Sequence, residues 1–84
     1  MKTYYITFRS ITFAQRGERL LRQGGVDCVL QRTPKWMEQR GCGYSLRVRP
    51  NDALRALELL KRGNAPYSKL FAQTDTGKME ELPV

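Results

Sequence analysis

The chain has 84 residues, 40% of them hydrophobic, which suits a single folded domain with one modest core. Fifteen Lys and Arg against eight Asp and Glu give a net charge of +7, which favours anionic partners. No apolar run approaches the roughly 18 residues that span a bilayer, and the N-terminus lacks the hydrophobic segment of a secretion signal. With only two cysteines and no histidine, neither a disulfide framework nor a zinc site is expected. We therefore expect a cytoplasmic protein with reduced thiols, no cofactor and no membrane segment.

Hydrophobic periodicity and turn residues divide the chain into six elements and a tail. Ser10 or Thr12 is expected to cap the first helix, and Gly24-Gly25 to end it in left-handed backbone. Residues 1–76 are expected to form the domain and residues 77–84, which lack periodicity, a loose C-terminal tail. We find no internal repeat. The expected elements are a strand at 4–8, a helix ending at 23, strands at 26–32 and 43–49, a helix at 50–61 and a strand at 67–74.

The order β-α-β-β-α-β predicts an α+β protein with the split arrangement of the ferredoxin-like fold. Two helices would cover one face of a four-stranded antiparallel sheet and leave the other face open. Helical spacing indicates which side chains of the two helices are buried. These are Phe13 or Ala14, Gly17, Leu20 and Leu21 in the first helix, and Ala53, Leu54, Leu57 and Leu60 in the second.

The stretch RGCGYSLRVR, residues 40–49, admits two interpretations. It resembles the basic-Gly-aromatic strand with which one class of RNA-binding domain stacks bases. Strand alternation argues against that use, because Tyr44 shares a side with the apolar Leu46 and Val48, which must face the helices. By the same argument Tyr5 is the one aromatic of the first strand on the open face, which makes a poor stacking platform. Binding of nucleic acid is therefore expected to be weak, non-specific and dependent on salt.

Two observations distinguish the two cysteines. Cys28 lies among apolar neighbours of a strand, which is typical of a packing residue, whereas Cys42 lies between Gly41 and Gly43, where a partner can approach closely. The split arrangement places the start of the third strand near the start of the first helix, whose free N–H groups and dipole stabilise an anion. Such surroundings lower the pKa of a thiol, and a thiolate there could hold a sulfur atom as a persulfide. The positive residues expected near Cys42 are Arg9, Arg32, Lys35 and Arg40.

The run FRSITFAQRGERLLRQGG, followed by a strand and then TPKWMEQRGCGYSLRV, resembles a family of small bacterial domains described as candidate selenium/sulfur carrier proteins. The resemblance covers residues 4–60, and its most specific elements are Phe8 with Ser10, Pro34 before a basic residue, and the Cys42-Gly43 pair. It implies a Cys-Gly thiol as the carrier site. Many members have a serine pair directly before that cysteine, and this chain has Arg40 and Gly41 there.

Three interpretations follow from the residues. The first is a carrier in which Cys42 is the reactive thiol, which Gly41, Gly43, Arg9, Ser10, Lys35 and Arg40 surround, and which exchanges sulfur or selenium with donor and acceptor proteins. The second is a small basic module for nucleic acid or protein in which Cys42 only packs. The third is a protein that forms a homodimer through the open sheet face, with Tyr5, Thr7, Ser45 and Arg47 in the contact. No histidine is present for a Cys-His couple and no carboxylate pair is positioned for acid-base work, so an independent enzyme is not expected.

Overall fold

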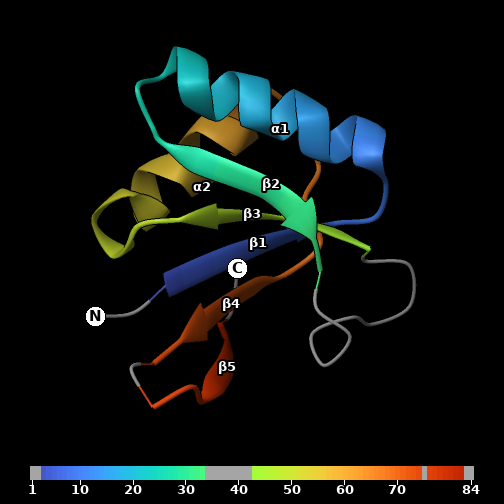
Figure 1. Cartoon of the computed structure of the whole chain (residues 1–84). Coiled ribbons are helices and arrows are strands. Elements are labelled where there is room, and N and C mark those ends of the chain that lie inside the picture. The colour runs from blue at the N-terminus through green and yellow to red at the C-terminus, as the bar shows by residue number, and fades with distance from the viewer. Residues whose placement is uncertain (1–2, 34–42, 75, 83–84) are drawn as a thin grey trace.

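A computed structural model describes residues 3–33, 43–74 and 76–82. It contains two α-helices, one short 3-10 helix and five strands, with both α-helices on one face of the sheet (Figure 1). The first six major elements follow the predicted order. Their bounds are β1 Thr3–Phe8, α1 Ile11–Gln23, β2 Cys28–Arg32, β3 Tyr44–Val48, the 3-10 helix η1 Pro50–Asp52, α2 Ala53–Arg62, β4 Leu70–Gln73 and β5 Met79–Leu82.

The sheet is antiparallel throughout and has the order β2-β3-β1-β4-β5. Its first four strands are consistent with the split β-α-β arrangement, in which β1 lies between β3 and β4. The predicted number of four strands is wrong, because residues 79–82, in the segment expected to form a loose tail, pair with β4. This fifth strand extends the sheet beyond β4 and lies below β4 in Figure 1.

The main core lies between the helices and the sheet. Ile6 and Phe8 of β1, together with Leu46 of β3, have no exposed surface and pack against Leu21 and Leu60 of the two helices. Each such side chain contributes about 1.5–3 kcal/mol when it is buried. The predicted inward side of β1 and β3 is therefore confirmed, since Val48 is also buried and Tyr44 packs against the same core.

Helix α1 begins as the sequence predicts. Ser10 is its N-cap: the Oγ atom accepts a hydrogen bond from the Phe13 N–H at 3.3 Å, and the Ser10 carbonyl accepts one from Ala14 at 3.1 Å. Gly24 follows the last helical residue, and Gly25 has a φ of 81°, the left-handed conformation that favours glycine. Both ends of α1 are therefore determined by local sequence.

The two helices end in the same way and stabilise each other's ends. Arg16 donates a hydrogen bond from α1 to the Gly63 carbonyl after α2 at 3.0 Å. Arg55 donates one from α2 to the Gly24 carbonyl after α1 at 2.8 Å. A leucine follows each arginine by four residues and packs against the glycine that ends the other helix. Leu59 packs against Gly24, and Leu20 packs against Gly63. A Cβ atom on either glycine would collide with the leucine side chain. The motif Arg-x3-Leu-x3-Gly is thus present twice and forms a reciprocal cap.

One predicted helix position is wrong, because Leu54 is 83% exposed and does not belong to the core. Of the two alternatives Phe13 and Ala14, the structure selects Ala14, since Phe13 is 39% exposed. Small side chains take their places: Ala14 on α1 and Ala56 on α2 have no exposed surface. Close approach of the helices to the sheet and to each other therefore favours alanine over the larger apolar residue beside it.

The face of the sheet away from the helices is less open than predicted. Tyr5, which was expected to be exposed, is 8% exposed; it packs against Phe71 of β4 and donates a hydrogen bond to the Gln73 Oε1 atom at 3.1 Å. Thr7 and Ser45, expected to contribute to a homodimer contact on this face, have no exposed surface. Arg47 and Val29 do face solvent. The accessible part of this face is therefore confined to the end at which β1 begins.

Candidate functional site

Three of the seven predicted site residues lie in the described part of the chain: Arg9, Ser10 and Gly43. The remaining four, Lys35, Arg40, Gly41 and Cys42, lie outside the described residues. Gly43 marks the end of the sheet at which the chain enters β3.

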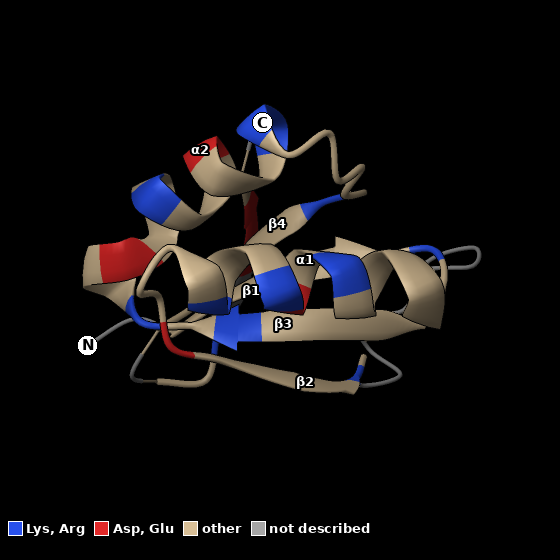
Figure 2. Ribbon diagram, turned by 90° about the horizontal axis from the view of Figure 1, so that it is seen from above, with Lys and Arg blue, Asp and Glu red and all other residues tan. Residues whose placement is uncertain are grey.

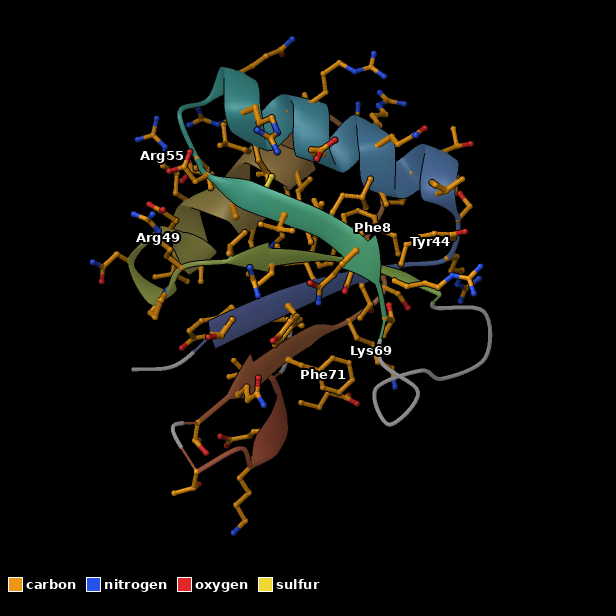
Figure 3. The ribbon with its side chains drawn as sticks, in the orientation of Figure 1. Phe8, Tyr44, Arg49, Arg55, Lys69 and Phe71 are labelled. Atoms are coloured by element: carbon orange, nitrogen blue, oxygen red, sulfur yellow. The ribbon has the colours of Figure 1, made fainter. Side chains whose placement is uncertain are left out.

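Strand pairing places the start of β3 beside the end of β1. Tyr44 pairs with Phe8 on one side and with Arg32 on the other. Gly43 precedes this pair, and its carbonyl accepts a hydrogen bond from the Thr33 N–H at 2.9 Å. Figure 3 shows Phe8 and Tyr44 together at this end of the sheet, where the chain also turns into α1.

The first turn of α1 gives this end a positive electrostatic character. The Ser10 side chain satisfies the Phe13 N–H, whereas no described residue accepts from the N–H groups of Ile11 and Thr12. No acidic residue occupies the first turn. Free N–H groups at a helix start carry a partial positive charge that stabilises an anion placed nearby.

Two arginines add full charges at the same end. Arg9 is exposed directly after β1, and the Arg32 guanidinium carbon lies 6.0 Å from the centre of the Tyr44 ring. Arg9 also lines a cleft of about 310 Å³, together with Phe13, Pro66, Tyr67 and Ser68. Elsewhere Lys and Arg are spread along both helices and on β3 (Figure 2), so this end is one of several positive regions.

Gly43 has space around it with respect to the described residues. A Cβ atom added there would meet no atom of residues 3–33, 43–74 or 76–82 within 4 Å, and its backbone does not have a positive φ. Neither its backbone conformation nor packing against the described residues therefore requires glycine at this position. Its absence of a side chain leaves the start of β3 accessible to an approaching group.

Cys28 is a packing residue, as predicted. It is 5% exposed within the main core, and its Sγ atom lies 4.0 Å from the Glu18 carbonyl oxygen. Burial raises the pKa of the Cys28 thiol, while the nearby Arg22 charge lowers it to a smaller extent. At neutral pH Cys28 is therefore a protonated thiol with little access to reagents.

Three hydroxyl groups on the other face of the sheet are buried: those of Thr7 and Ser45, which were expected to be exposed in a homodimer contact, and that of Thr33, which sequence analysis did not single out. The Thr7 Oγ1 atom accepts a hydrogen bond from the Lys69 N–H at 3.0 Å. The Oγ atom of Ser45 and the Oγ1 atom of Thr33 are buried without a hydrogen-bond partner among the described residues. Serine and threonine are usually exposed, and nothing in the local pattern distinguishes these three.

The described residues contain no group of three His, Cys, Asp or Glu side chains that could hold a metal ion. Within the same ranges, neither helix has the length and apolar character needed to cross a membrane.

Comparison with protein-family models matches residues 3–72 to the family described as "Putative Se/S carrier protein-like". The chain belongs to this family. Membership confirms the resemblance, and the match extends from β1 to β4, so β5 lies beyond it. Carriers act by exchange with donors and acceptors, so the family points to partner proteins of that general kind. Comparison with curated proteins returned no match, and comparison with solved structures returned none.

Proposed function

We propose that this chain carries sulfur or selenium as a persulfide-type adduct on the thiol of Cys42 and passes it to an acceptor protein. The observation that carries the proposal is the state of the other thiol. The chain has two cysteines, and Cys28 is buried in the core with a raised pKa. In a family described by chalcogen carrying, Cys42 is then the cysteine suited to exchange.

The transfer needs no external oxidant or reductant. The Cys42 thiolate attacks the outer sulfur of a donor persulfide, R–S–SH. A new S–S bond forms to Cys42 as the donor S–S bond breaks, and the donor leaves as the thiolate R–S⁻. The outer sulfur keeps its oxidation state, and its proton is shared with solvent. A thiolate acceptor reverses the same step, and selenium in the outer position follows the same balance.

The geometry near Gly43 supports this chemistry. Cys42 is joined to Gly43 by a peptide bond, and Gly43 lies at the end of the sheet where α1 begins. The free N–H groups of α1 and the charges of Arg9 and Arg32 favour an anion at this end. A thiolate and the persulfide anion that it forms are both such groups, and a low thiol pKa increases the reactive fraction at neutral pH.

The test is intact-protein mass after incubation with a cysteine desulfurase and cysteine. We expect a gain of one sulfur atom, about 32 Da, that dithiothreitol removes. The adduct should persist in Cys28→Ser and disappear in Cys42→Ser. A reductant-sensitive adduct that remains in Cys42→Ser, or no adduct on the folded wild-type protein with any persulfide donor, would contradict the proposal.

A further inference from the structure

The face of the sheet away from the helices contains a second positively charged site. It lies at the end where β1 begins, separate from the end that includes Gly43. It is a cleft of about 570 Å³, a volume within the usual range for small-molecule sites. Strand register places Val29, Arg47 and Tyr5 in one row of side chains across its floor. Beside this row the cleft is lined by the paired residues Thr3 and Gln73, and by Asp27 and Arg49, whose side chains contact each other.

Arg47 is the central side chain of this cleft. It is exposed between Val29 and Tyr5, and it forms no ion pair or side-chain hydrogen bond with any described residue. Val29 is 45% exposed and pairs directly with Arg47 across the sheet, so it provides an apolar wall beside the guanidinium. A positive fork of five N–H donors therefore faces a cleft with nothing in the described chain to accept from it.

Arg49 adds a second charge two residues further along the same side of the chain. Its contact with Asp27 is long, at 4.0 Å, and both side chains are largely exposed, at 75% and 83%. An ion pair of this kind contributes little and breaks readily when a better acceptor arrives. In Figure 3, Arg49 lies just after the last residue of β3, at the opposite end of the strand from Tyr44 and far from Phe8. The cleft thus offers two guanidinium groups against one weakly engaged carboxylate.

The cleft is closed on one side. The next row across the sheet contains Thr7 and Ser45, which have no exposed surface. A nucleic-acid strand that crossed the whole sheet would need that row to be accessible. The boundary therefore favours a ligand that fits within the cleft over a polymer that passes through it.

We propose that this cleft binds a small organic phosphate, with the phosphate between Arg47 and Arg49 and the apolar body of the ligand against Val29 and Pro50. A phosphate monoester is a dianion near neutral pH, and its oxygens match the planar guanidinium fork in a bidentate way. Tyr5 and Gln73 are already joined by a hydrogen bond and hold the opposite wall in place. The site does not depend on Cys42.

Calorimetric titration of the full chain tests the site, with adenosine monophosphate as the probe and with adenosine and inorganic phosphate as comparison ligands. We expect adenosine monophosphate to bind more tightly than inorganic phosphate, and adenosine to bind weakest. Arg47→Gln and Arg49→Gln should each weaken binding at least about tenfold, because each removes charge-assisted hydrogen bonds. Arg47→Lys, which keeps the charge and loses the fork, should fall between wild type and Arg47→Gln.

Arg19→Gln is the matched control, because Arg19 is an exposed arginine of α1 that has no ion pair with a described residue. It lowers the net charge equally and should change the affinity less than about twofold. Equal weakening by Arg19→Gln and Arg47→Gln would show attraction by net charge alone and overturn the proposal. Absence of binding, binding of adenosine as tight as that of its monophosphate, or preference for a single-stranded oligonucleotide over the monophosphate would also overturn it.

Amide chemical shifts give an independent readout. Addition of adenosine monophosphate should move the signals of Val29, Arg47 and Arg49 and leave those of Ser10 and Gly43 in place. Shifts confined to the Ser10 and Gly43 end would assign the ligand to the other site and contradict the proposal. The unperturbed spectra of the variants also show whether each has kept its fold.

Discussion

Cys28 shows how strongly the surroundings of a thiol decide its role. Its raised pKa means that the folded protein keeps a proton that the unfolded chain releases. Below the ordinary value of 9.0 both states are protonated, and the free energy of unfolding does not depend on this group. Above that value the unfolded chain loses its proton first, so the free energy of unfolding falls as the pH rises toward the folded pKa.

We expect the wild-type protein to lose more stability than Cys28→Ala between about pH 8 and about pH 10. Urea unfolding at several pH values measures the difference in the free energy of unfolding. Contributions from the titration of tyrosines and lysines cancel in this difference, because both proteins contain the same ones. At neutral pH, Cys28→Ser should lower the free energy of unfolding by about 1–3 kcal/mol, since the hydroxyl is buried. Parallel pH profiles for wild type and Cys28→Ala would contradict the role of burial.

Gly17 is required by packing. A Cβ atom there would lie 2.9 Å from the Phe8 Cζ atom and 3.1 Å from the Leu60 Cδ2 atom. Alanine gains about 1 kcal/mol of helix propensity, but overpacking costs about 1–3 kcal/mol, and rigid Phe8 has no free direction in which to move. We expect Gly17→Ala to lower the free energy of unfolding by about 1–2 kcal/mol in urea titrations. The control is Gln15→Ala, an exposed change on the same helix, which should lie within about 0.5 kcal/mol of wild type. A stabilised Gly17→Ala would show that this contact relaxes freely.

At the scale of elements, the reciprocal cap can be tested directly. Arg16→Met and Arg55→Met keep an apolar stem and remove the donors to the Gly63 and Gly24 carbonyls. Each should lower the free energy of unfolding by about 0.5–1 kcal/mol, a modest value because both hydrogen bonds are exposed. Arg19→Met, on the same helix without such a bond, should change it by less. Equal effects of all three in thermal and urea unfolding would mean that the carbonyl contacts contribute nothing specific.

Local signals predicted the elements well, and non-local contacts decided what was missed. Ser10 and Gly25 act within one helical turn, so sequence alone identified both ends of α1. Residues 79–82 carry no strand alternation of their own, and they become a strand because β4 offers them an unpaired edge. Tyr5 is buried because Phe71, distant in sequence, lies beside it. For the candidate site, the end of the sheet that holds Ser10 and Gly43 could be inferred from strand order, and the position of Cys42 stays a prediction.

At the scale of the whole molecule, β5 protects an edge. It pairs with β4 along its length, adds an ion pair between Lys69 and Glu81 at 3.2 Å, and packs the partly buried Leu82 against the core. Deletion of residues 75–84 should therefore lower the unfolding midpoint and expose the β4 edge to intermolecular pairing. Chromatography at increasing protein concentration should show association of the shortened chain. Glu81→Gln, which removes the ion pair alone, should associate no more than wild type and should lower the free energy of unfolding by less than about 1 kcal/mol. A shortened chain that is as stable and as dispersed as wild type would contradict this role.

The reciprocal cap relates the two helices as two subunits of a symmetric dimer are related. Arg16 reaches the end of α2 as Arg55 reaches the end of α1, which is the defining property of an isologous contact. Here both helices belong to one polypeptide, so the contact forms within the chain and does not depend on protein concentration as a dimer would. Each half carries the surface that completes the other. Two peptides cut between β2 and β3 should accordingly be complementary fragments, each with one helix whose final turn is finished by its counterpart.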